Sequence, residues 1–157
     1  MNATIKRVQG FSAEEHLVLL AEKSSNLSKY GFSKPELSFL GKEITRGEKL
    51  ISLNQYGRWI FVNIIEQKKE SAGTKEAARK AGRQLLSLVQ KYKLQEVTIV
   101  DALNKPEVAL AFAEGMLLGN YQFLKYRKDA AKELNVLKTI KIQSASVGEA
   151  QIKELQV

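Results

Sequence analysis

Short apolar runs separated by polar segments recur along this chain and predict β-strands. The run at residues 17–20 is aliphatic throughout, which is typical of a strand covered on both faces. Gly57, in the short connection at residues 55–58, favours a tight reversal and therefore predicts a hairpin between the strands beside it. The predicted strands span residues 4–8, 15–21, 49–54, 59–65, 96–100 and 136–142.

Between these strands, apolar residues recur at the three- and four-residue spacing of helices. Ser33 or Lys34 is the predicted cap of the first helix, because Pro35 and Glu36 are typical of a first helical turn. Thr74 ends the turn before the second helix and is its predicted N-cap. The predicted helices span residues 34–46, 75–92, 106–121 and 147–157.

The order of these elements predicts the fold class. Strands alternate with helices after residue 59, which favours a sheet with parallel crossovers and helices on both faces. The early hairpin adds an antiparallel pair. We therefore expect an α/β protein, a three-layer α/β/α sandwich with a mixed central sheet. The length of 157 residues suits one domain with a single sizeable core.

Composition excludes most familiar catalytic machinery. The chain has no Cys and a single His, which excludes thiolate metal sites, cysteine nucleophiles and most His-based triads. No Gly-rich phosphate loop occurs. We therefore assign no catalytic, cofactor-binding or metal residue. No apolar run approaches the roughly 18 residues of a membrane span, and no secretory signal opens the chain, so we expect a cytoplasmic protein without a membrane partner.

Several positions have both a functional and a structural interpretation. His16 begins an apolar strand and is predicted to be structural, because the sequence offers no other His or Cys as a partner. Asp101 follows a strand, where ligands often bind in α/β sheets, but the favoured interpretation is that Asp101 or Asn104 caps the turn before the helix at Pro106. Gly115 and Gly119 lie within a helical pattern, which favours close packing over ligand capture.

The charge of the chain is uneven. Its 25 basic and 17 acidic residues give a net charge of +8. The excess falls in two blocks, residues 68–93 and 125–141, around a slightly acidic middle. Both blocks are predicted to lie on the surface, where they offer nucleic-acid contacts as an alternative to an ordinary solvated face. The candidate contacts are Arg79, Lys80, Arg83, Lys125, Arg127 and Lys128.

Placed on a helix, residues 108–123 are apolar on all sides. One side can pack on the sheet of this domain. Another side requires a partner surface, either a second domain of the same polypeptide or another subunit, unless its small alanines simply line an exposed face. The candidate interface residues are Leu110, Leu117, Leu118 and Tyr121.

This helix also carries a family resemblance. Residues 109–127 resemble the segment that closes the N-terminal domain of the leucyl (cytosol) aminopeptidase family, and residues 78–82 resemble its R-K-A-G helix. Residues 66–69 depart from the family, in which a Gly-rich turn is common, so a divergent branch is expected. The matching positions are Glu114, Gly115, Leu118, Gly119, Tyr121, Phe123 and Tyr126, with Arg127 where Lys is usual.

The resemblance implies a macro-domain-like sandwich over residues 1–145, with residues 146–157 beginning a helix towards a catalytic domain outside this sequence. It implies a non-catalytic N-terminal domain of a two-zinc exopeptidase that removes N-terminal residues from peptides. Its role would be interdomain packing and homo-oligomer assembly, since the family forms hexamers. No cofactor is expected in this chain; zinc or manganese is expected in the catalytic domain.

Two alternatives remain at this stage. The first is a nucleic-acid-binding module that uses the basic residues, since some bacterial members of the family also bind DNA. The second is an ADP-ribose-binding macro domain, which rests on fold analogy alone and lacks the phosphate-loop glycines.

Overall fold

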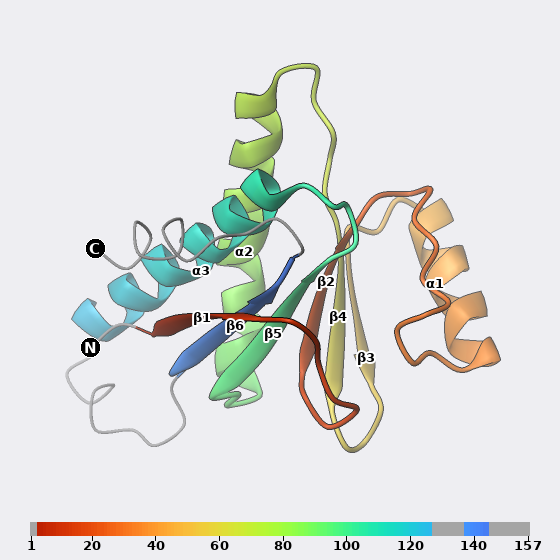
Figure 1. The fold of residues 1–157 in the computed structure, drawn as a ribbon, viewed down its shortest axis with the longest axis horizontal. Coiled ribbons are helices and arrows are strands. Elements are labelled where there is room, and N and C mark those ends of the chain that lie inside the picture. Colours follow the sequence, from red (N-terminus) through yellow and green to blue (C-terminus); the bar gives the residue numbers. More distant parts are fainter. Residues whose placement is uncertain (1–2, 127–136, 145–157) are drawn as a thin grey trace.

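A computed structural model describes residues 3–126 and 137–144. Its six-stranded sheet has the order β1-β6-β5-β2-β4-β3, and among these strands only β3 runs antiparallel to its neighbour (Figure 1). The strands are β1 (Thr4–Val8), β2 (Leu17–Ala21), β3 (Leu50–Asn54), β4 (Trp59–Ile64), β5 (Glu96–Asp101) and β6 (Thr139–Gln143). The helices are α1 (Lys34–Thr45), α2 (Ser71–Lys91) and α3 (Pro106–Tyr126).

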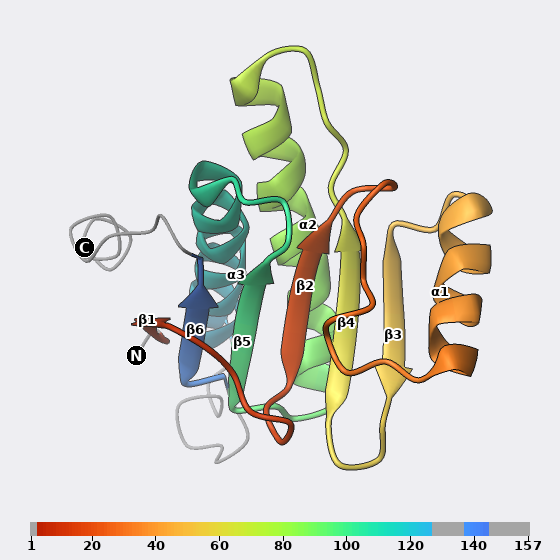
Figure 2. The ribbon, with the colours of Figure 1, turned by 45° about the vertical axis from the view of Figure 1, so that its right-hand side comes forward.

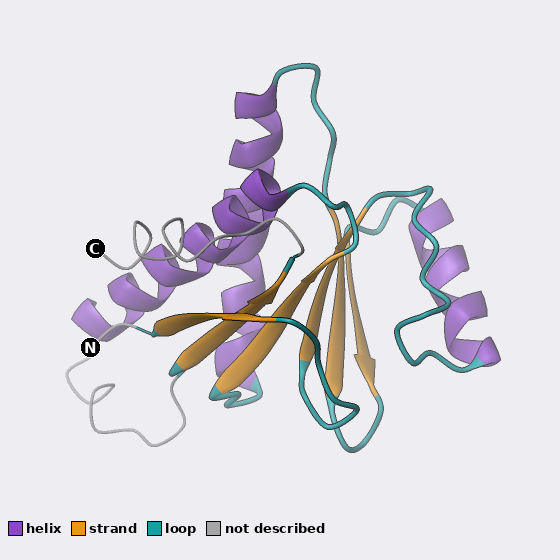
Figure 3. Ribbon diagram, viewed as in Figure 1, coloured by secondary structure: helices purple, strands orange, loops and turns teal. Residues whose placement is uncertain are grey.

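The helices lie in two layers around this sheet. Helices α2 and α3 cover one face and α1 covers the other, as Figures 2 and 3 show. Every residue of β2 is fully buried because its alternate side chains enter two separate cores. Val18 packs in the core beneath α2 and α3, and Leu19 packs in the core beneath α1. The predicted three-layer α/β/α sandwich with a mixed sheet is confirmed.

Helix α1 begins where the sequence predicts. The hydroxyl of Ser33 accepts a hydrogen bond from the Glu36 amide at 3.3 Å, and the Glu36 carboxylate accepts one from the Ser33 amide at 2.8 Å. This reciprocal capping box satisfies two amides of the first turn. Beyond the helix, Gly47 has a φ of +94°, a left-handed conformation that glycine adopts at little cost. The predicted hairpin of β3 and β4 is also present.

The predicted start of α2 is wrong. The helix begins at Ser71, so the expected turn is its first turn, and Thr74 lies inside it. The Thr74 hydroxyl accepts a hydrogen bond from the Lys68 amide at 2.9 Å. This bond joins the preceding loop to the first turn of α2. The Thr74 side chain therefore holds the loop and does not cap the helix.

Other boundaries differ by a few residues or lie outside the described ranges. Helix α3 extends five residues beyond the predicted end at Tyr121, and β2 begins two residues later than predicted. The start of the last predicted strand, residue 136, and the predicted helix at residues 147–157 lie outside the described residues. Within the two described ranges, no helix has both the length and the apolar content that crossing a bilayer requires.

Candidate interface on the crossed helices

Helices α2 and α3 touch through their backbones. A Cβ atom at Gly82 of α2 would lie 2.2 Å from the carbonyl oxygen of Phe112, and one at Gly115 of α3 would lie 2.1 Å from that of Arg79. Real Cβ atoms do not approach carbonyl oxygens this closely, so both positions require glycine at this helix separation. One turn further along α3, a Cβ at Gly119 would lie 2.8 Å from Cδ2 of Leu86. The prediction that Gly115 and Gly119 serve close packing is confirmed.

An ion pair lies beside this crossing. Nε of Arg79 lies 3.4 Å from Oε1 of Glu114, and Nη1 of the same guanidinium lies 3.4 Å from Oε2 of Glu76. These groups are partly exposed, so each pair contributes only a few tenths of a kcal/mol, up to about 1 kcal/mol. Their main effect is to hold the guanidinium between two carboxylates, one from each helix.

The four predicted interface residues do not all lie on the solvent-exposed side of α3. Leu118 and Tyr121 are exposed, with 46% and 52% of their surface accessible. Leu110 is half-buried and packs against the core. Leu117 is 5% exposed and belongs to the core, so its expected place on the outer surface is wrong. The reason is its helical position: it follows buried Ala113 by one turn and therefore faces the sheet.

The basic residues that were candidates for nucleic-acid contacts are not a uniform positive face. Arg79 contacts two carboxylates, whereas Lys80 and Arg83 are exposed on α2. Arg83 lines a shallow depression between α2 and α3 together with Gln122. Lys125 is exposed near the end of α3, and Arg127 and Lys128 lie outside the described residues. The neutralised Arg79 weakens the electrostatic argument for nucleic acid.

A second candidate region lies at the carboxyl ends of β2 and β4. The chain leaves β2 towards α1 on one face and leaves β4 towards α2 on the other, so the crevice between them is a topological switch point, where α/β proteins commonly bind ligands (Figure 2). A hollow of about 590 Å³ occupies it. Its lining residues are Glu22, Lys23, Ser24, Gly47, Glu48, Lys49, Ile64, Ile65, Glu66 and Gln67.

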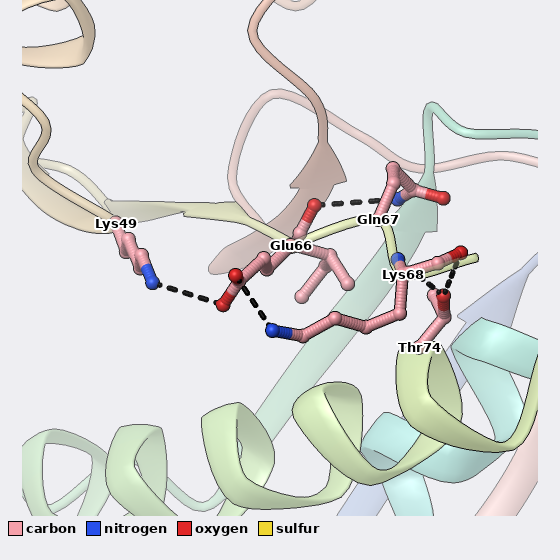
Figure 4. Close-up of polar contacts among 6 residues, drawn as sticks. Lys49, Glu66, Gln67, Lys68 and Thr74 are labelled. Carbon is pink, nitrogen blue, oxygen red and sulfur yellow. Dashed lines mark hydrogen bonds and ion pairs between the residues drawn. The ribbon is translucent and has the colours of Figure 1, made fainter. Parts of the chain in front are cut away.

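Charged residues dominate the rim of this crevice. The carboxylate of Glu66 accepts contacts from Nζ of Lys49 at 3.2 Å and from Nζ of Lys68 at 2.7 Å (Figure 4). The hydrogen bonds and charges of Lys68 and Lys49 lower the pKa of Glu66. Sequence reasoning did not single out this triad, although its charged run directly after a buried strand is a recognisable signal for a strand-end site. Because the triad is exposed and both of its lysines already contact the Glu66 carboxylate, it offers little to a ligand.

Asp101, at the end of β5, is used within the chain. Its carboxylate accepts hydrogen bonds from the Leu103 amide at 3.1 Å and from the Ser144 hydroxyl at 3.0 Å. Burial raises its pKa despite these bonds, which act in the opposite direction. The first bond closes the turn that leads to α3, so the predicted capping role is confirmed. Within residues 3–126 and 137–144, no cluster of three His, Cys, Asp or Glu residues could hold a metal ion.

His16 joins β2 to β4. Its Nδ1 accepts a hydrogen bond from the Trp59 amide at 2.9 Å, which requires the neutral ring with its proton on Nε2. Burial and, secondarily, the nearby Arg58 guanidinium lower its pKa. Arg58 is itself 6% exposed and donates to the carbonyl oxygens of Ser12 and Tyr30 at 3.3 and 3.4 Å. The predicted structural role of His16 is confirmed.

We expect this histidine to make the fold sensitive to mild acid. Because its pKa is lower in the folded chain, the unfolded chain binds a proton first, and stability falls as the pH drops below about 6.5. His16→Asn keeps an acceptor near the Nδ1 position and removes the titration. Urea unfolding followed by Trp59 fluorescence should therefore show wild type losing stability relative to the variant between about pH 6.5 and 5. Parallel pH profiles of the two proteins would contradict this assignment.

Comparison with known proteins identifies the segment that contains the helix crossing. Residues 68–130 match the N-terminal domain of the cytosol aminopeptidase family. The match includes α2 and α3 with both crossing glycines, so the resemblance read from the sequence is confirmed. No curated protein sequence matches the chain.

Solved structures extend the likeness to the whole fold. A mutant of tomato leucine aminopeptidase is similar with a TM-score of 0.68 and 14% identity, over 98% of this chain and 35% of that one. The macrodomain of Oceanobacillus iheyensis with MES bound is similar with a TM-score of 0.64 and 14% identity, over 99% of this chain and 91% of that one. The macrodomain of Thermus aquaticus DarG is similar with a TM-score of 0.56 and 13% identity, over 89% of this chain and 98% of that one. At such identities the similarity establishes a macrodomain-like fold alone.

Proposed function

We propose that this chain is the non-catalytic N-terminal domain of a leucyl aminopeptidase, whose catalytic domain holds zinc or manganese. In this proposal the chain supports interdomain packing and oligomer assembly in the cytoplasm. The observation that carries it is the match over residues 68–130, in which the signature residues form a helix crossing. Gly82 and Gly115 each lie against a backbone carbonyl group of the facing helix, and Arg79 of α2 forms an ion pair with Glu114 of α3. This use of the signature fits a packing role better than a chemical one.

The macrodomain likeness supports an ADP-ribose role less well. Two of the similar Oceanobacillus structures contain ADP and ADPR. In this chain, however, the segments that follow β4 and β5, residues 65–70 and 101–105, contain no glycine, and the segment that follows β2, residues 22–33, contains a single one, Gly31. Backbone amides that cradle phosphate generally need glycine for close approach, so these loops are poorly suited to a pyrophosphate.

The proposal predicts aminopeptidase activity in the native protein and none in this chain alone. The purified chain, supplied with Zn²⁺ or Mn²⁺, should not hydrolyse Leu-p-nitroanilide. The protein captured from its own cells with an antibody to this chain should hydrolyse the substrate, and a chelator should abolish that activity. Metal-dependent turnover by the purified chain would contradict the non-catalytic role. Captured protein that has no peptidase activity would contradict the aminopeptidase assignment.

A further inference from the structure

A stripe of four residues runs along the outer face of α3. Glu114, Leu118, Tyr121 and Lys125 follow one another at spacings of four, three and four, which places them on one side of a helix. The side chain of Glu114 is 38% exposed, Leu118 and Tyr121 are about half exposed, and Lys125 is exposed. We call these four residues the α3 stripe. Its length is about 16 Å from the rise of an α-helix.

The order of chemistry along the stripe is self-complementary. Two apolar residues lie in the middle, an acidic residue lies at one end and a basic residue lies at the other. A two-fold axis that passes between Leu118 and Tyr121 would place Leu118 against Tyr121 of the second copy. It would also place Tyr121 against Leu118 of that copy. The same axis would place Glu114 against Lys125 of the second copy at both ends. A parallel arrangement would instead bring equal charges together.

We propose that the α3 stripe binds the α3 stripe of a second copy of this chain in an antiparallel pair. The proposal rests on the assembly role given above and names the partner. Arg79 contacts Oε1 of Glu114, and a carboxylate can accept a second cation at its other oxygen, so the ion pair within the chain is compatible with the one between copies. Nucleic acid is a poorer occupant because Glu114 would face its phosphates.

The apolar centre of the stripe is small. Leu118 and Tyr121 supply the exposed apolar surface, which is less than the roughly 800 Å² per partner of a standard interface. The pair is therefore weak, and it forms at high protein concentration or within a larger assembly. This sets the conditions of the test: sedimentation velocity of the whole chain over a wide concentration range and at low salt.

Charge reversal tests the antiparallel register. Glu114→Lys alone and Lys125→Glu alone each place equal charges at both ends of the pair, and each should weaken self-association about tenfold. A mixture of the two variants restores opposite charges at both ends and should associate as well as wild type. Glu76→Lys is the matched control: it makes the same charge change and removes the other carboxylate on Arg79, but it lies on α2 outside the stripe.

The outcomes separate this inference from the proposed function. Equal thermal midpoints of all variants would show that association, not folding, is affected. A wild-type chain that stays monomeric at every concentration overturns the α3 pairing, as do single variants that associate like wild type. A mixture that fails to recover association also overturns it. None of these results alters the aminopeptidase assay, which tests the proposed function separately.

Discussion

Gly115→Ala and Gly82→Ala are each expected to lower the free energy of unfolding by about 3 kcal/mol or more, at the upper end of the cost of overpacking. Each substitution places a methyl group 2.1–2.2 Å from a backbone carbonyl oxygen of the facing helix. A backbone carbonyl cannot rotate away as a side chain can, so the helices must separate. That separation would loosen the buried contacts of Phe112 and Met116 beneath them.

Urea unfolding measured by fluorescence of the single tryptophan, Trp59, provides the readout. Trp59 stacks on Tyr92 with their ring centroids 4.1 Å apart, so its emission reports the packing of α2 on the sheet. Gly41→Ala is the control, because Gly41 lies inside α1 and a Cβ there meets nothing within 4 Å. It should stabilise the chain by about 0.5–1 kcal/mol through helix propensity. A Gly115→Ala protein as stable as wild type would contradict the close crossing.

Leu117→Asp is expected to destabilise the isolated chain by about 3 kcal/mol or more. Leu117 is 5% exposed and packs in the core beneath α3. The substitution removes its apolar contacts and places a carboxylate among the buried apolar side chains of that core. Chemical unfolding at neutral pH measures the effect. A loss below about 1 kcal/mol would show that the carboxylate reaches water and that α3 does not seat Leu117 in the core.

The sequence predicts the layers of this fold well because their signals are local. The apolar run of β2 and the Ser33–Glu36 capping box each specify their element within a few residues. The start of α2 is different. Thr74 has the chemistry of an N-cap, but the Lys68 amide occupies its hydroxyl, and that bond depends on how the loop returns to the helix. Residue spacing alone does not reveal such a loop contact.

The outer face of α3 shows the same limit. A helix that is apolar on all sides has no polar stripe to mark its solvent face, so the sequence does not distinguish Leu117 from Leu118. The distinction comes from the crossing with α2: Gly82 and Gly115 fix the rotation of α3 about its own axis. The sequence indicates that these glycines serve packing. It does not indicate which backbone carbonyl groups of the facing helix they contact.

The central claim is that α3 has one apolar side that belongs to this chain and another that serves contacts beyond it. The most direct measurement is the thermal midpoint of Leu118→Asp, taken together with its sedimentation. Leu118 is 46% exposed, so we expect a midpoint within about 2 °C of wild type, together with loss of concentration-dependent sedimentation. A fall in midpoint as large as that of Leu117→Asp would place Leu118 in the core and contradict the claim.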